Sequence, residues 1–219
     1  LEPLADAILA NPGLDPQLLA DNYLNAEAGF GDTKAVLDGA RQILMERFAE
    51  DADLLAALRQ FLVDHAQLAS RLVDGKADEA AKFRDYFEHT EALAKIPSHR
   101  ALAMFRGRNE GFLNLNLVMH DQEKPTDAHP CEAMIAGHWH IKDQQRPGDA
   151  WLHDTVRWTW RVKLLTHLQT DLLGQLRERA EQDAPECFFP SSTCSRWASA
   201  PPRPIPWARW WQEGVSSIF

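Results

Sequence analysis

Apolar residues recur at intervals of three and four along most of the first 91 residues, which is the spacing of amphipathic helices. The clearest runs are Leu4, Ile8 and Leu9; Val36, Leu37, Ala40, Ile43, Leu44 and Phe48; and Leu54, Leu55, Leu58, Leu62, Leu68 and Leu72. Asp15 before Pro16 and Asp32 before Thr33 place carboxylates where they can cap helix N-termini. The pattern therefore predicts a bundle or array of several short helices.

A different pattern occupies residues 98–118. Ser98 is a candidate N-cap and Pro97 disfavours helix in the residue before it, so we expect a helix to begin near His99. Gly107 and Gly111 favour a helix end and a turn within "FRGRNEG". After the turn, leucines alternate with asparagines, as they do in a half-buried strand. The sequence therefore predicts a helix-turn-strand unit with one short β element near 112–118.

The longest helical pattern begins at Asp149 and continues to about residue 183, with one stripe of Leu165, Leu168, Leu172 and Leu176. Thirty-five helical residues would reach ~50 Å, so we expect this helix to link modules. From residue 185 the periodicity stops, and the last 35 residues hold six of the 13 prolines and four of the eight tryptophans. We therefore expect a mainly α chain with a helical core at 1–148, a linking helix at 149–184 and an irregular tail at 185–219.

Charge is distributed unevenly along the chain. The net charge is −9, and residues 1–91 hold 8 Lys and Arg against 18 Asp and Glu. Residues 92–120 reverse this balance, with 4 basic residues against 1 acidic residue. The overall charge disfavours binding to a phosphate backbone, so any contact with nucleic acid requires a local basic patch.

Arg100, Arg106 and Arg108 are the candidate nucleic-acid-binding residues of this basic window. A guanidinium group offers a planar fork of donors that can hold two oxygens of a phosphate or carboxylate. If Arg106 and Arg108 lie together on the glycine-flanked turn, they form a small phosphate site.

A structural interpretation competes with this one. The same arginines can form internal ion pairs with Asp85, Glu88 or Glu91 in the preceding segment "KFRDYFEHTEA", which we expect to be an acidic helix. Arginines beside an acidic helix are more often structural than ligand-binding. Both interpretations remain open from the sequence.

A zinc site is the metal hypothesis that the sequence raises. His129, Cys131, His138 and His140 carry the ligand types that Zn²⁺ prefers. Their spacing lacks the close pairs of a zinc finger, so we expect no metal and no other cofactor.

Tryptophans and cations cluster at the start of the long helix. The residues are Trp151, Trp158, Trp160, Arg157, Arg161 and Lys163. They could stack on bases beside a line of positive charge. Because tryptophans in a leucine-rich helix are usually buried, we expect them to belong to the core.

Signals for catalysis, export and membrane insertion are missing from the sequence. We find no paired acid/base carboxylates, no nucleophile beside a placed base and no phosphate loop of the form GxxxxGK[ST]. Three irregularly spaced cysteines fit a reducing compartment. We therefore expect a cytoplasmic protein that is not an enzyme and does not contact a membrane.

The segment "PSHRALAMFRGRNEG" resembles the bacterial transcription accessory protein family Tex. The resemblance extends through "LEPLADAILANPGLDPQLLADNYLN" and "HPCEAMIAGHWHIKDQQRPGDAWLHDTVRWTWRVKLLTHL", so that it covers about residues 1–184. It implies a fragment of a large multidomain protein that acts in transcription. The fragment matches the helical region that precedes an RNase-H-like domain in this family.

The resemblance also implies a function. Family members bind RNA or single-stranded DNA, mainly through a C-terminal OB-type domain, so we expect this fragment to act chiefly as a helical scaffold with a secondary contact at the arginines. The alternative is a scaffold that docks other domains or the transcription machinery without touching nucleic acid. After residue 184 the resemblance stops, and we expect the tail at 185–219 to be a frameshifted or non-native segment.

Overall fold

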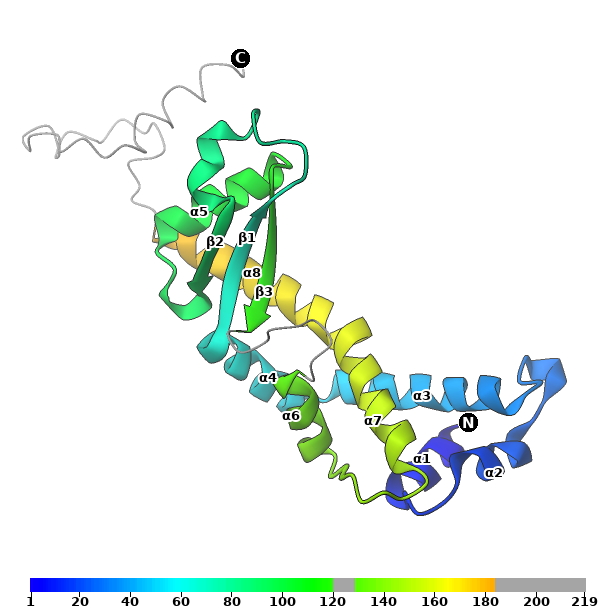
Figure 1. Ribbon diagram of the computed structural model, residues 1–219. Helices are drawn as coiled ribbons and strands as arrows, with labels where there is room; N and C mark the ends of the chain where they lie inside the picture. The colour runs from blue at the N-terminus through cyan, green and yellow to red at the C-terminus, as the bar shows by residue number, and fades with distance from the viewer. Residues whose placement is uncertain (120–128, 184–219) are drawn as a thin grey trace, which may run out of the picture. The chain divides into compact units, whose positions relative to one another are not determined.

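The computed structural model describes residues 1–119 and 129–183 and is mainly α, as the periodicity predicts. The first four helices are α1 (Glu2–Ala10), α2 (Pro16–Ala20), α3 (Thr33–Glu50) and α4 (Ala52–His65). α3 packs against both α1 and α2 (Figure 1). The tail at 185–219 lies outside the described residues, so its nature remains a prediction.

The predicted helix caps are confirmed. Asp15 accepts a hydrogen bond from the backbone N of Gln17 at 2.9 Å, and Asp32 accepts one from the N of Ala35 at 2.6 Å. Asp51 does the same for α4, where Leu54 N donates at 2.8 Å. Each carboxylate satisfies a donor that the first turn leaves without a partner.

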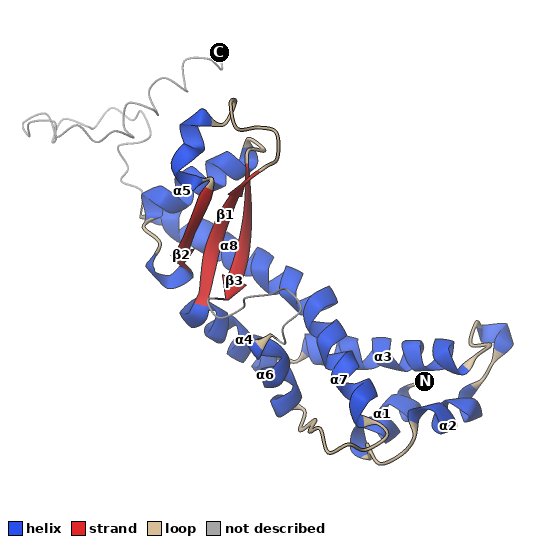
Figure 2. Ribbon diagram, in the orientation of Figure 1, coloured by secondary structure: helices blue, strands red, loops and turns tan. Residues whose placement is uncertain are grey.

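A three-stranded antiparallel sheet interrupts the helices (Figure 2). Its order is β2 (Glu88–Ala92), β1 (Ala66–Leu72) and β3 (Leu113–Met119), so β1 is the central strand. The register places Leu68 opposite Leu117 on one side of the sheet, and Arg71 opposite Asn114 on the other. α5 (Ser98–Asn109) packs against β3 and against the long helix, and this covers the apolar face.

The predicted β element at 112–118 is β3, but two expectations for the neighbouring segments were wrong. Leu68 and Leu72 continue the spacing of α4, yet they lie in β1. The segment "KFRDYFEHTEA", expected to be a helix, forms a short 3₁₀ turn at Ala81–Tyr86 followed by the edge strand β2. Strand pairing with distant segments overrides the local helical pattern in both cases.

The long helix predicted from Asp149 is present as one continuous helical run. It consists of α7 (Asp149–Trp158), a π-helical segment (Thr159–Leu164) and α8 (Leu165–Gln182). Every fourth residue along it is buried: Leu152, Val156, Trp160, Leu164, Leu168, Leu172, Leu176 and Ala180. A spacing of four exceeds the 3.6 residues of an α-helical turn, so the buried stripe winds around the helix.

The winding stripe gives the long helix different neighbours along its length. α7 contacts α3 and α6 (Pro130–His138), whereas α8 contacts α4 and α5. The wider turn of the π-helical segment accommodates part of the rotation of the buried stripe between α7 and α8. The helix therefore joins the N-terminal helices to the sheet within one unit, residues 1–183.

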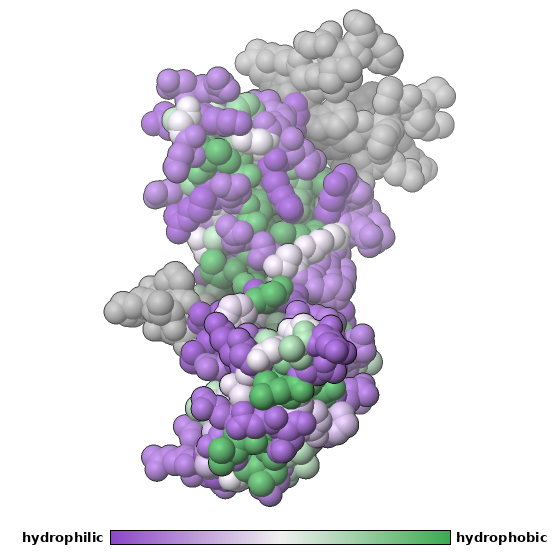
Figure 3. Space-filling model, turned by 90° about the vertical axis from the view of Figure 1, so that its right-hand side faces the viewer, coloured by the Kyte–Doolittle hydropathy of each residue, from purple (hydrophilic) through white to green (hydrophobic). Residues whose placement is uncertain are grey.

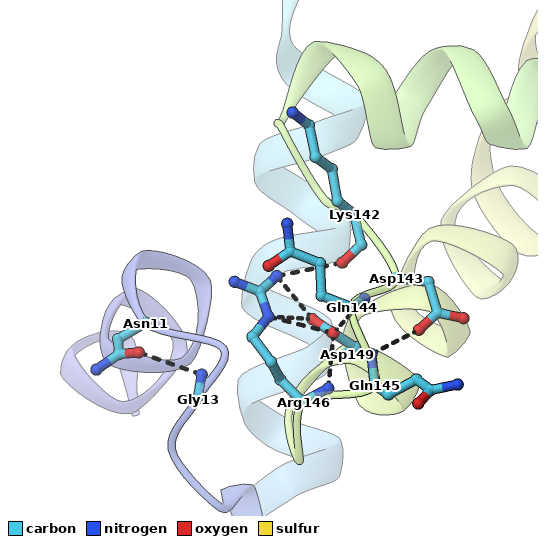
Figure 4. Close-up of polar contacts among 8 residues, drawn as sticks. All are labelled: Asn11, Gly13, Lys142, Asp143, Gln144, Gln145, Arg146 and Asp149. Carbon is cyan, nitrogen blue, oxygen red and sulfur yellow. Dashed lines mark hydrogen bonds and ion pairs between the residues drawn. The ribbon is translucent and has the colours of Figure 1, made fainter.

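A buried carboxylate fixes the start of the long helix (Figure 4). Asp149, with 2% of its side chain exposed, accepts hydrogen bonds from the backbone N of Gln144 and of Arg146 and from the Arg146 side chain at 2.8 Å. The hydrogen bonds with Arg146 lower the pKa of Asp149 to about 2. The loop before α7 is thereby folded back onto the first turn of α7, and Gly148 N donates to Pro12 O at 2.9 Å.

No helix within residues 1–119 and 129–183 has both the length and the apolar character that crossing a bilayer requires.

Candidate nucleic-acid interface

α5 carries all three predicted arginines, and one side of it is buried. Ala101, Met104, Phe105 and Gly107 form that side. The helix does not end at Gly107 as the sequence suggested, but runs on to Asn109. Ser98 is not its cap, since the Ser98 hydroxyl donates to the Asp183 carboxylate at 2.8 Å.

Arg100 is held by an internal ion pair. Its guanidinium donates to Oε1 of Glu91 at 3.0 Å, while the other oxygen of Glu91 lies 3.2 Å from Nε2 of His89. Glu91 belongs to β2, and its side chain is only 20% exposed. The structural interpretation is thus confirmed for this pair, although Glu91 lies on a strand and not on a helix.

Arg106 is held by the residue that ends α5. Its Nε donates to Glu110 at 2.8 Å, and Lys82 pairs with the same carboxylate. Burial acts to raise the pKa of Glu110, but the hydrogen bonds from Lys82 and Arg106 outweigh it and leave that pKa below its usual value. Glu110 is therefore charged near neutral pH, and it neutralises part of the cation cluster.

Arg108 differs from both neighbours. Its side chain is exposed, and within the described part of the chain it forms no ion pair. In an α-helix, residues two positions apart are separated by 200° around the helix axis, at 100° per residue. Arg106 and Arg108 therefore lie on nearly opposite sides of α5. The structure therefore does not bring them together on a turn, as the sequence hypothesis required. Among the same residues, Asp85 and Glu88 form no ion pair either.

The tryptophans of the long helix divide into two groups. Trp151 and Trp160 are buried, as expected, with 9% and 2% of their surface exposed. Trp158 is 52% exposed, so the expectation of burial was wrong for this residue. The nearby cations all have carboxylate neighbours: Arg157 with Asp154, Arg161 with Glu132 and Lys163 with Glu46.

Three of the four residues of the zinc hypothesis, His129, Cys131 and His138, are engaged in other packing or polar contacts, and His140 is exposed. His129 accepts from the backbone N of Cys131 at 3.2 Å and packs on Trp160, and burial lowers its pKa to about 4. Cys131 is buried, and burial raises its pKa to about 12. His138 Nε2 lies 3.0 Å from the Asp51 carboxylate. Within residues 1–119 and 129–183, no three metal-ligating side chains are grouped together.

The fold and these contacts define a mainly helical unit with a small sheet, in which internal carboxylates hold Arg100 and Arg106, two of the four cations of the basic window. A family model described as Tex central region-like matches residues 11–188. The chain belongs to the Tex family.

Curated relatives agree with this assignment. The chain is 52% identical over 189 residues to Protein YhgF of Escherichia coli (strain K12), and 48% identical over 193 residues to Protein tex of Bordetella pertussis. It is 45% identical over 189 residues to Transcriptional accessory protein Tex of Neisseria gonorrhoeae. Each match covers 86% of this chain and 24% of the relative, so the chain spans about a quarter of the length of these relatives.

Proposed function

We propose that this chain is the helical scaffold of a cytoplasmic transcription accessory protein that acts on RNA or single-stranded DNA. Its own contact with nucleic acid in the basic window is confined to the exposed end of α5, around Arg108. We assign no enzymatic activity to it, and nuclease activity of the purified chain would contradict this part of the proposal. The printed name of the Neisseria gonorrhoeae relative, a transcriptional accessory protein, supports the proposed setting.

The observation that carries the proposed contact is the difference among the three arginines. Arg100 and Arg106 already donate to Glu91 and Glu110, so a phosphate would have to displace a hydrogen-bonded carboxylate. Arg108 is exposed and needs no such exchange. A cation that is free before binding contributes its full charge to a phosphate contact.

The test measures how affinity depends on salt. Labelled oligouridine and oligothymidine are titrated with the chain between 50 and 200 mM salt, the range over which phosphate contacts lose most of their strength. Arg108→Ala should lower the slope of log affinity against log salt by about 0.7, the value for one phosphate contact on a single strand. Lys34→Ala, which removes an exposed cation at the start of α3, is the matched control.

A second variant tests the same contact region by an expected increase in affinity. Glu110→Gln removes the carboxylate that holds Arg106, so binding should become tighter and more salt-dependent. Equal slopes for wild type, Arg108→Ala and Lys34→Ala would eliminate the contact at α5.

The second candidate function is a scaffold that binds a protein and not a nucleic acid. The observation in its favour is the surface of the first 65 residues, which hold 4 Lys and Arg against 12 Asp and Glu and expose Leu14, Leu18 and Leu24. Figure 3 shows apolar patches between the polar side chains on one face of the molecule. If the chain binds neither oligonucleotide at 50 mM salt, where electrostatic binding is strong, this alternative is favoured.

A further inference from the structure

The outer side of the long helix carries an apolar pair that faces solvent. Trp158 ends α7 with 52% of its surface exposed, and Val162 follows four residues later in the π-helical segment with 54% exposed. Residues four apart are neighbours on a helix surface. The two side chains therefore form one exposed apolar patch on the stretch between α7 and α8.

The local packing explains why Trp158 faces outward. Val156, Thr159 and Trp160 are all buried, because they continue the stripe that faces α3 and α6. Trp158 lies on the opposite side, immediately before the π-helical segment. Such segments are rare and occur frequently at functional sites. An indole that is half exposed beside one is a candidate for contact with a ligand.

Two arginines lie along one side of this patch. Arg157 precedes Trp158 and is 52% exposed, and Arg161 lies one turn later and is 43% exposed. The ion pair of each has an N···O distance of 3.5 Å, which is longer than a good N–H···O hydrogen bond. The pairs of Arg100 and Arg106 on α5 measure 3.0 and 2.8 Å. Arg157 and Arg161 are therefore held more weakly than the arginines of the basic window.

The carboxylate that pairs with Arg161 is not hydrogen-bonded to it. Glu132 is a buried carboxylate on α6, and its Oε1 accepts no hydrogen bond in the described part of the chain. The guanidinium thus keeps donors that can turn towards a phosphate without breaking a hydrogen bond to Glu132.

We propose that Trp158, Arg157 and Arg161 form a binding site for single-stranded nucleic acid, in which one base stacks on the indole and the two guanidiniums contact the flanking phosphates. An aromatic ring beside two cations suits a strand whose bases and phosphates alternate. Stacking needs only the flat face of a base, so this site accepts RNA and DNA with little preference for sequence. The inference rests on the proposed function, because it adds a second contact for the same class of ligand.

The experiment separates stacking from general apolar docking. Trp158→Phe keeps an aromatic ring, Trp158→Leu keeps apolar surface without a ring, and both are titrated with oligouridine and oligothymidine at constant low salt. Trp158→Leu should lose roughly fivefold or more in affinity, and Trp158→Phe should retain most of it. Because Trp158 is exposed, both variants should keep the thermal midpoint of the wild type.

A second arm tests the cations. Arg161→Gln should lower the salt slope by about 0.7, while Trp158→Leu should change affinity and leave the slope unaltered. Equal affinities of wild type and Trp158→Leu would overturn the stacking site. If Trp158→Leu binds the oligonucleotides as well as Trp158→Phe does, an aromatic ring is not required and the inference is wrong.

The two proposals fail in different ways. If affinity depends on Trp158 but the salt slope is the same for wild type and Arg108→Ala, only the proposed contact at α5 is ruled out. A chain that binds neither oligonucleotide would overturn both proposals.

Discussion

At Gly107, the contact between α5 and the sheet leaves no space for an added methyl group. A Cβ built on Gly107 would lie 2.5 Å from Cδ1 and 2.9 Å from Cγ of Leu113, and 3.2 Å from a ring carbon of Phe83. Leu113 is buried at the start of β3 and Phe83 is buried in the 3₁₀ turn. A glycine in the last turn of α5 is therefore required by packing, although glycine is a poor helix former.

Gly107→Ala should destabilise the protein by about 1–3 kcal/mol, because overpacking outweighs the gain in helix propensity. The control is Gly174→Ala in α8, where no atom lies within 4 Å of the added Cβ. This control should be neutral or stabilising by up to ~1 kcal/mol. Urea denaturation measures both, and a Gly107→Ala variant as stable as the control would contradict the packing seen here.

The candidate site could be predicted in part at this scale. The sequence gathered Arg100, Arg106 and Arg108 in one window, and the spacing of four between Arg106 and Glu110 matches a helical ion pair. The pair between Arg100 and Glu91 depends on a strand that comes next to α5 only in the folded chain, so local pattern could not indicate it. The exposure of Trp158 depends in the same way on how the long helix packs.

The loop before α7 is an element whose geometry depends on one charge. Asp149 accepts from two backbone N–H groups and from Arg146, while Arg146 also donates to Lys142 O at 3.1 Å. Because these hydrogen bonds lower the pKa of Asp149 to about 2 from an ordinary 3.8, the folded state binds its proton less readily than the unfolded state does. The resulting stabilisation is complete above about pH 4 and is lost as the pH falls through about 2.

Asp149→Asn should lower the urea midpoint at neutral pH, since the amide keeps the shape but loses the charge that Arg146 and the backbone donors require. The difference from wild type should shrink as the pH is lowered from about 4 towards 2, where the wild-type carboxyl takes up its proton. Asp143→Asn is the control, since Asp143 is exposed and, within the described part of the chain, accepts a single hydrogen bond, from Gln145 N. A difference that stays constant over this range would show that the charge is not the cause.

Prediction of the elements succeeded where the periodicity was long and local. α3, α4 and the helix from Asp149 followed from apolar spacing, and β3 followed from strict alternation. β1 was missed because Leu68 and Leu72 are four residues apart, a spacing that also occurs on one face of a helix. β2 was missed because an edge strand with charged side chains, as in Glu88–Ala92, carries no apolar alternation.

The core of residues 1–183 is shared by nearly all helices, and Cys131 lies within it. The Cys131 side chain is fully buried at the first turn of α6, and burial raises its pKa to about 12. A thiol reacts as the thiolate, so both inaccessibility and protonation protect it. Modification of this residue therefore requires opening of the core.

Alkylation of Cys131 should be slower in the native protein than in urea by at least ~1000-fold, because it requires the rare open state. The measurement uses a Cys187→Ser/Cys194→Ser background, in which Cys131 is the one remaining cysteine of the sequence. Rapid labelling without denaturant, at the rate seen in urea, would show that α6 opens independently of the remaining core.

The winding stripe of the long helix has a consequence for how the chain folds during synthesis. Residues 149–182 are made after every other described element, yet they supply the surface against which α3, α4, α5 and α6 pack. Synthesis adds about 5–20 residues per second, so the apolar sides of the earlier elements stay uncovered for several seconds while the long helix is made. Among the described elements, the long helix thus completes the core, and the nascent segment is most exposed to aggregation and to chaperones just before that step.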